Sequence, residues 1–109
     1  MGFGIRFNII MQKQWFTYII TNHTNTVVYI GVTNNLERRI FEHKKGLIKS
    51  SFSKKYRLYK VVWFEEFNTP VEAIAAEKMI KGWKREKKNA LIERINPHWS
   101  DFLQNVSHS

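Results

Sequence analysis

The sequence predicts a small α/β (α+β) sandwich, in which helices flank a three-stranded antiparallel sheet in the order β-β-α-β-α-α. Three observations predict this fold class. Two runs of β-branched and aromatic residues are joined by a polar turn, two later segments begin with helix-capping residues, and a third apolar run lies between those segments. A chain of 109 residues, 43% of them hydrophobic, is long enough for one compact domain and too short for two.

The first two strands form a predicted β-hairpin. Residues 15–21 and 27–31 are rich in the residue types that strands favour. Asn22–Thr26, between them, consists of turn-forming residues. We expect Gly31 to end the second strand, because glycine lets the backbone turn freely.

The first helix is expected over Leu36–Lys45. Asn34 is a favourable N-cap, Glu37 stands three residues later as in a capping box, and a glycine follows the last predicted turn. Arg39 and His43 are four residues apart, so they share one face of this helix.

The middle of the chain is expected to return to the sheet. Residues 47–57 are polar, basic and rich in serine, which predicts an exposed loop. Leu58–Phe67 is dominated by valine, tryptophan and phenylalanine and is predicted to be the third strand.

A second helix is expected to begin at Thr69 and to run to about Arg85. Thr69 is a favourable N-cap and Pro70 suits the first helical position. Apolar residues recur every four positions along this helix and are expected to face the core. They are Val71, Ala75, Met79 and Trp83.

A third helix is expected over Lys87–Ile95, and Asn96-Pro97 should end it because the residue before proline avoids the helical region. The apolar residues that follow should fold back on the core; they are Trp99, Phe102 and Leu103. We therefore divide the chain into a leader or extra strand (1–12), one domain (13–103) and a frayed tail (104–109).

The net charge of +9 predicts a polyanionic partner, and nucleic acid is the commonest one inside a cell. No stretch approaches the ~20 apolar residues needed to cross a bilayer, so no membrane partner is expected. The chain has no cysteine, which excludes disulfide scaffolds and thiolate zinc sites and fits a cytoplasmic location.

One local pattern carries chemistry. Tyr29-Ile30-Gly31 follows Tyr18 by eleven residues and precedes Arg39 and His43 on the predicted helix. This pattern resembles the GIY-YIG nuclease domain, in particular small standalone members related to the nuclease module of UvrC repair proteins. The first signature is degenerate, because Phe16-Thr17-Tyr18 stands where Gly-Ile-Tyr is usual and only the tyrosine remains. The resemblance covers nearly all of residues 15–102.

The resemblance implies a metal-dependent, structure-selective endonuclease, acting in DNA repair or recombination, that leaves 5′-phosphate and 3′-hydroxyl ends. It implies catalytic roles for Tyr18, Tyr29, Arg39, His43 and Glu77. Tyr18 is our choice for the general base, with Tyr29 as the alternative. Glu77 would hold one Mg²⁺ or Mn²⁺, and Arg39 would stabilise charge on the phosphate.

Each assignment has an ordinary structural alternative. The tyrosines are typical of hairpins, and a free phenol, with a pKa near ~10, needs help to act as a base at neutral pH. His43 could be a solvated helix residue. Glu77 and Lys81 have the spacing of a common exposed ion pair.

Further residues are expected around the site. The predicted nucleic-acid-binding residues are Arg38, Lys44, Lys54, Lys55, Lys81, Lys84 and Lys88. Thr33, Asn34 and Asn96 are expected to support the site from nearby, the last by its resemblance to an asparagine near the domain's end.

DNA is the favoured partner, and targeting is expected to come from nucleic-acid shape, a partner protein or a homodimer. The degenerate first signature also motivates an alternative, a non-catalytic nucleic-acid-binding module on the same fold. A protein held by charge at a membrane surface is a third class, and it fits least because no basic helix shows a clean apolar face.

Overall fold

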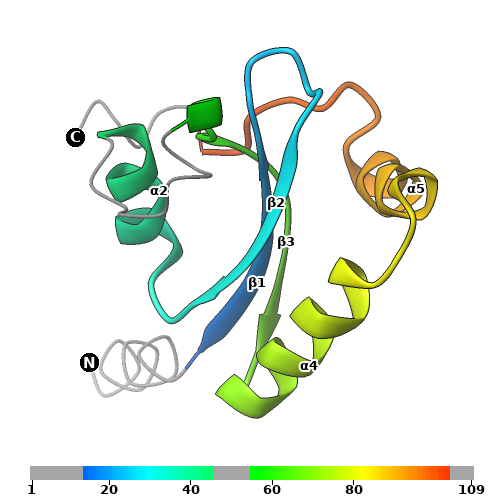
Figure 1. Ribbon diagram of the computed structural model, residues 1–109. Helices are drawn as coiled ribbons and strands as arrows, with labels where there is room; N and C mark the ends of the chain where they lie inside the picture. The colour runs from blue at the N-terminus through cyan, green and yellow to red at the C-terminus, as the bar shows by residue number, and fades with distance from the viewer. Residues whose placement is uncertain (1–13, 46–54, 104–109) are drawn as a thin grey trace.

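The fold is a three-stranded antiparallel sheet with helices on both faces (Figure 1). The computed structural model describes residues 14–45 and 55–103. Its elements are β1 (Trp15–Thr21), β2 (Val28–Thr33), α2 (Leu36–Lys44), β3 (Lys60–Phe67), α4 (Pro70–Lys81) and α5 (Arg85–Ile95). This arrangement confirms the predicted fold class and element order. The predicted leader, the predicted tail and most of the predicted 47–57 loop lie outside the described residues.

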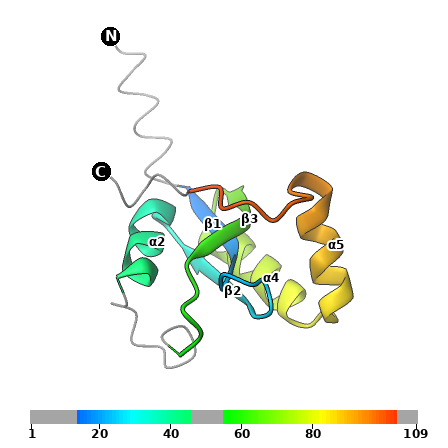
Figure 2. The same cartoon turned by 90° about the horizontal axis from the view of Figure 1, so that it is seen from above.

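The sheet has the strand order β2-β1-β3, and it separates two apolar clusters. Figure 2 shows α2 on one side of the sheet and α5 on the other. Because successive side chains of a strand point to opposite faces, β1 supplies both clusters. Tyr18 and Ile20 pack with Leu36 and Ile40 of α2. Ile19 packs on the opposite side with residues of α4, α5 and the segment after them, namely Ile80, Ile92 and Trp99.

The hairpin and first helix follow the prediction with two corrections. β2 does not end at Gly31 but continues to Thr33, since Gly31 is paired with Tyr18 inside the ladder. The N-cap of α2 is Asn35 and not Asn34, because the Asn35 side chain accepts a hydrogen bond from the backbone N–H of Arg38 at 3.0 Å. The predicted capping box with a glutamate at the third helical position is therefore wrong by one residue.

The second predicted helix, α4, is shorter than expected, and the third predicted helix, α5, begins two residues earlier than expected. The start of α4 is as predicted: the Thr69 side chain accepts from the backbone N–H of Glu72 at 3.2 Å, and proline follows the cap. However, α4 ends at Lys81 and α5 begins at Arg85. The guanidinium of Arg85 donates to the carbonyls of Asn25 and Thr26 in the hairpin turn, at 2.6 and 3.0 Å. These bonds hold the start of α5 against the turn, so the chain bends before it.

The predicted core face of α4 is wrong. Val71 is 74% exposed, Met79 is 55% exposed, and Ala75 is also exposed. The buried residues are instead Ala73 and Ile80. Of the predicted set only Trp83, which lies beyond the helix, packs against the core.

The end of the domain matches the prediction more closely. Asn96 is the C-cap of α5, and Trp99 is buried in the core. Leu103 packs against the cluster on the α2 side, and the exposed ring of Phe102 meets Phe64 edge to face at 6.1 Å. No helix in the described parts of the chain has the length and apolar character to cross a membrane.

Candidate active site

The side chain of Tyr18 lies over Gly31 of the edge strand β2. The two residues are direct partners in the β1–β2 ladder, so substituents on their Cα atoms project from the same face. A Cβ atom at position 31 would overlap the Tyr18 hydroxyl and lie 2.5 Å from Cζ of its ring. The missing side chain at Gly31 therefore makes the room in which the phenol lies.

Three rings from three elements meet beside α2. Tyr18 of β1, Tyr29 of β2 and His43 of α2 contact one another edge to face, with centroids 5.9 to 6.5 Å apart. The hydroxyl of Tyr18 lies 3.4 Å from Nε2 of His43. The structure thus brings together three of the five residues that were predicted to be catalytic.

Burial keeps the Tyr18–His43 pair uncharged at neutral pH. Burial raises the pKa of Tyr18 well above its usual range. Tyr29 raises this pKa further, whereas the positive charge of Arg39 lowers it. Burial also lowers the pKa of His43 to about 4, with the positive charge of Arg39 as the second cause. A neutral phenol and a neutral imidazole can each donate or accept, so the contact can pass a proton in either direction.

Arg39 lies one helical turn before His43 and influences both members of the pair. Its Nη1 is 3.8 Å from Oε1 of Glu42, in a partly exposed ion pair. Its Nε is buried and has no hydrogen-bond partner among the described residues. Because the side chain is 34% exposed, the rest of the guanidinium can still reach a ligand with several oxygens, such as a phosphate. Sequence reasoning missed Glu42, although its spacing of three residues from Arg39 was an available signal.

Glu77 belongs to α4, which packs on the opposite face of the sheet from α2 (Figure 1). Its side chain is 19% exposed, and Oε2 lies 2.8 Å from Nζ of Lys81. The predicted surface pair therefore exists. However, the charge of Glu77 also contributes to the raised pKa of Tyr18, so the carboxylate acts on the tyrosine from across the sheet.

A single divalent ion fits Glu77 in its chemistry. A carboxylate oxygen is the ligand type that Mg²⁺ and Mn²⁺ favour. A bound ion would replace Lys81 as the partner of the Glu77 carboxylate. Within residues 14–45 and 55–103, no three histidine, cysteine, aspartate or glutamate side chains gather into a larger metal site.

The predicted nucleic-acid-binding residues fall into two groups. The outer group consists of Arg38, Lys55, Lys81 and Lys84, which are exposed, and Lys88, which is partly exposed. Lys44 is turned inward: its side chain is 14% exposed and its Nζ lies 3.6 Å from Oδ2 of Asp101. A phosphate contact of Lys44 would therefore compete with Asp101 and stays a prediction. Lys54 lies outside the described residues.

The three predicted supporting residues make hydrogen bonds near the site or at the end of the domain. The hydroxyl of Thr33 bonds both the N–H and the carbonyl of Asn35, in the turn that leads into α2. Asn34 accepts from Nη2 of Arg38 at 3.4 Å. Asn96 is buried against β3, and its Nδ2 donates to the carbonyl of Val62 in that strand at 3.0 Å. Thr33 and Asn34 therefore adjoin the helix of Arg39 and His43, whereas Asn96 fixes the end of the domain.

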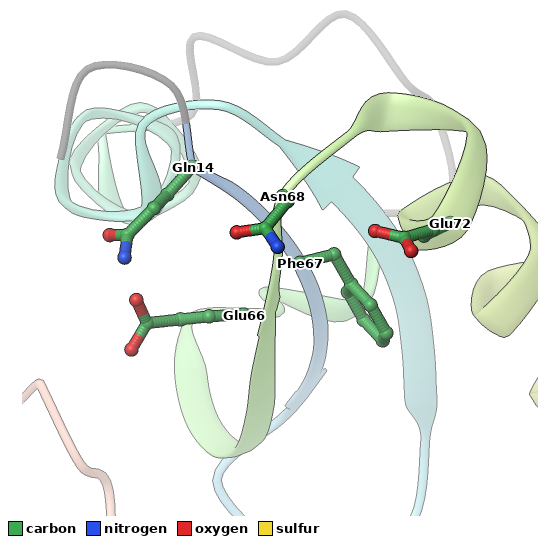
Figure 3. A pocket seen from close by; sticks show the side chains of 5 residues that line it. All are labelled: Gln14, Glu66, Phe67, Asn68 and Glu72. Carbon is green, nitrogen blue, oxygen red and sulfur yellow. The ribbon is translucent and has the colours of Figure 1, made fainter. Parts of the chain in front are cut away.

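A polar pocket at the end of β3 is separate from these residues (Figure 3). It is lined by Gln14, Glu66, Phe67, Asn68 and Glu72. None of the predicted site residues lines it. We therefore place the candidate site at the tyrosine–histidine cluster and not in this pocket.

Known proteins share the sequence that builds this cluster. The GIY-YIG catalytic domain matches residues 14–90, which include both tyrosines, Arg39, His43 and Glu77. The chain belongs to the GIY-YIG family. The resemblance inferred from the sequence is thereby confirmed, and the matched range of this GIY-YIG domain ends inside α5.

Several relatives are small proteins of similar length. A UPF0213 protein of Vibrio parahaemolyticus is 35% identical over 83 residues, which cover 76% of each chain. A UPF0213 protein of Listeria welshimeri is 39% identical, over 75% of this chain and 90% of its own. The solution structure of a UPF0213 protein from Bacillus halodurans matches 84% of this chain and 95% of its own, with a TM-score of 0.52 and 22% identity. That structural likeness shows the shared fold.

Proposed function

We propose that this GIY-YIG protein is a divalent-metal-dependent endonuclease that hydrolyses phosphodiester bonds, with branched, flapped, single-stranded or damaged DNA as its substrate. A role in repair or recombination belongs to the same proposal. The observation that supports it most directly is the contact of the Tyr18 hydroxyl with Nε2 of His43, 3.4 Å apart, within the influence of the positive charge of Arg39. A base, a proton acceptor behind it and a phosphate ligand are the parts that hydrolysis needs.

Tyr18 would activate the attacking water through a relay. Its hydroxyl oxygen takes the proton of the water while its own proton passes to Nε2 of His43. The raised pKa of Tyr18 disfavours a free phenolate, and the relay avoids one because the two transfers are coupled. A bound phosphate would offset the charge of Arg39, the second cause of the low pKa of His43, so the histidine becomes a better base once substrate is present.

Arg39 and Glu77 would act on the phosphate itself. The partly exposed guanidinium of Arg39 supplies donors toward the charge that develops in the transition state. Tyr29, in edge-to-face contact with both Tyr18 and His43, keeps the two rings in place and orients the water. Glu77 would hold the divalent ion, whose chemistry when bound is to neutralise the phosphate and the departing 3′ oxygen.

The test is cleavage of labelled DNA and RNA in duplex, single-stranded, flapped and branched forms, with Mg²⁺ or Mn²⁺. We expect Tyr18→Phe to lower kcat roughly a hundredfold or more and Arg39→Ala to do the same. Lys45→Gln, at the exposed C-cap of α2, is the control. Cleavage that survives Arg39→Ala and Glu77→Gln would show that another site is responsible.

A non-catalytic nucleic-acid-binding module is the second candidate. The two altered residues of the first signature serve packing: Phe16 meets Phe64 edge to face at 6.2 Å, and the hydroxyl of Thr17 donates to the carbonyl of Ala73 at 2.7 Å. Binding of DNA with no cleavage of any form, at any metal concentration, would favour this candidate over the nuclease.

A further inference from the structure

The segment after α5 runs along the outer edge of β3 and reaches α2. We call residues 96–103 the strap. Hydrogen bonds attach it directly to β3. The N–H of Phe102 donates to the carbonyl of Val61 at 2.8 Å, and Nδ2 of Asn96 donates to the carbonyl of Val62. Figure 2 shows the strap crossing from α5 toward the side of the sheet where α2 lies.

Asp101 joins the strap to the last turn of α2. Its Oδ1 accepts from the backbone N–H groups of Val61 and Leu103, both at 3.1 Å, so the carboxylate is fixed by backbone on both sides. Its Oδ2 lies 3.6 Å from Nζ of Lys44, which also donates to the carbonyl of Leu103 at 3.3 Å. The two side chains are only 11% and 14% exposed. An ion pair this buried is screened little by solvent and holds its partners in one geometry.

The position of this ion pair bears on the site because Lys44 adjoins His43. Helix α2 has nine residues, too few to be stable by itself, so its orientation depends on what it packs against. Leu36 and Ile40 anchor its beginning and middle in the core. At its end, the link from Lys44 to Asp101 fixes how far His43 reaches toward Tyr18.

The strap is not part of the matched family domain, which ends at residue 90. We propose that Lys44 and Asp101 are positioning residues: their ion pair fastens the end of α2 to the strap and thereby holds His43 against the Tyr18 hydroxyl. The effect on rate rests on the proposed nuclease function, whereas the placement of His43 can be measured without it.

The first measurement is an NMR titration of the His43 ring, which needs no activity. We expect it to titrate near pH 4 in the wild type, as burial dictates, and closer to the ordinary ~6.5 in Lys44→Gln, since a loosened α2 admits water. Lys44→Arg keeps the charge and should behave as the wild type does. The matched control is Lys45→Gln, the exposed neighbour. An unchanged His43 titration in Lys44→Gln would overturn the proposal.

The second measurement is steady-state cleavage by the same variants. Lys44→Gln should lower kcat roughly ten- to a hundredfold, the usual cost of a misplaced catalytic group, with little change in KM. Recovery in Lys44→Arg is the outcome that a purely structural role does not predict. A shifted His43 titration with unchanged kcat would overturn the catalytic part of the proposal.

The two measurements separate this proposal from the proposed function. A wild type that cleaves nothing removes the nuclease function, while the titration still decides whether the ion pair places His43. Should Lys44→Gln fail to fold, as a thermal melt will show, Asp101→Asn repeats the comparison because it keeps an oxygen for the Val61 and Leu103 N–H groups.

Discussion

Gly31 shows how one residue can decide the chemistry of another at the residue scale. Its part in the signature is to leave the space that the ring of its cross-strand partner, Tyr18, occupies. The sequence predicted the residue and its closeness to the site but assigned it to the end of a strand. An isolated glycine in a strand signals either a bend or a close approach, and only the register distinguishes the two.

Substitution of Gly31 by alanine should therefore damage the site more than the fold. The new methyl group overlaps the Tyr18 hydroxyl, so the ring must leave the position in which it contacts His43. We expect a loss of about 1–3 kcal/mol in the free energy of unfolding, measured by urea denaturation, and a loss of nearly all cleavage activity.

The matched control is Gly82→Ala. A Cβ atom there meets only the carbonyl oxygens of Met79 and Lys78, at ordinary distances of 3.5 and 3.7 Å, and the backbone φ of −79° suits any residue. Stability should stay the same or rise slightly. Equal damage from both substitutions would contradict the role given to Gly31.

The buried imidazole of His43 should make the protein sensitive to mild acid. Its pKa is lowered to about 4 in the folded state from about 6.5 in the unfolded chain, so the unfolded state takes up the proton first as the pH falls. The free energy of unfolding should drop between pH 6.5 and 4, by at most about 2 kcal/mol at pH 5. Urea denaturation at pH 7 and pH 5 measures this drop, and it should largely vanish in His43→Gln.

At the scale of elements, α4 shows what a helical pattern leaves open. Its capping was predicted correctly, because capping depends on neighbouring residues alone. Its buried face was not, since apolar residues line both faces and a spacing of four cannot say which one meets the sheet. The sheet side carries Ala73, whose carbonyl accepts from Thr17 of β1 at 2.7 Å, and such a close approach admits only a small side chain. The larger residues Val71 and Met79 are left outside.

This reversal predicts very unequal effects for two substitutions on α4. Ala73→Leu should destabilise the protein by about 1–3 kcal/mol, because the added atoms have no room between α4 and β1. Met79→Gln should change the free energy of unfolding by less than about 0.5 kcal/mol, because the residue is already 55% exposed. Denaturant midpoints of the two variants decide the matter, and a larger loss for Met79→Gln would restore the face predicted from periodicity.

At the scale of the whole molecule, the candidate site is a product of the topology. Two strands, α2 and α4 contribute the residues that the family signature predicts for it. The distances could not be predicted, because they depend on the register of β1 with β2 and on the tilt of α2. The buried position of the Lys44 side chain could not be predicted either, since its partner Asp101 lies 57 positions later in the chain and belongs to no motif.

The distribution of charge predicts how nucleic acid will bind. Among the described residues, the outer group offers exposed or partly exposed cations that phosphates can reach, although Arg38 and Lys81 also pair with Glu42 and Glu77. In EDTA, where a metal-dependent enzyme cannot cleave, the dissociation constant should rise steeply with salt. Each phosphate contact contributes roughly 0.7–0.9 to the slope of log K against log salt concentration.

Two lysine variants test which cations take part. Lys84→Gln should lower that slope by about one contact's worth, whereas Lys44→Gln should leave it unchanged because Asp101 already neutralises that ammonium group. Fluorescence anisotropy across a salt series measures both slopes. An equal fall for both variants would mean that the Lys44–Asp101 pair opens when nucleic acid binds. The strap would then be a part that moves during binding and not a fixed support for α2.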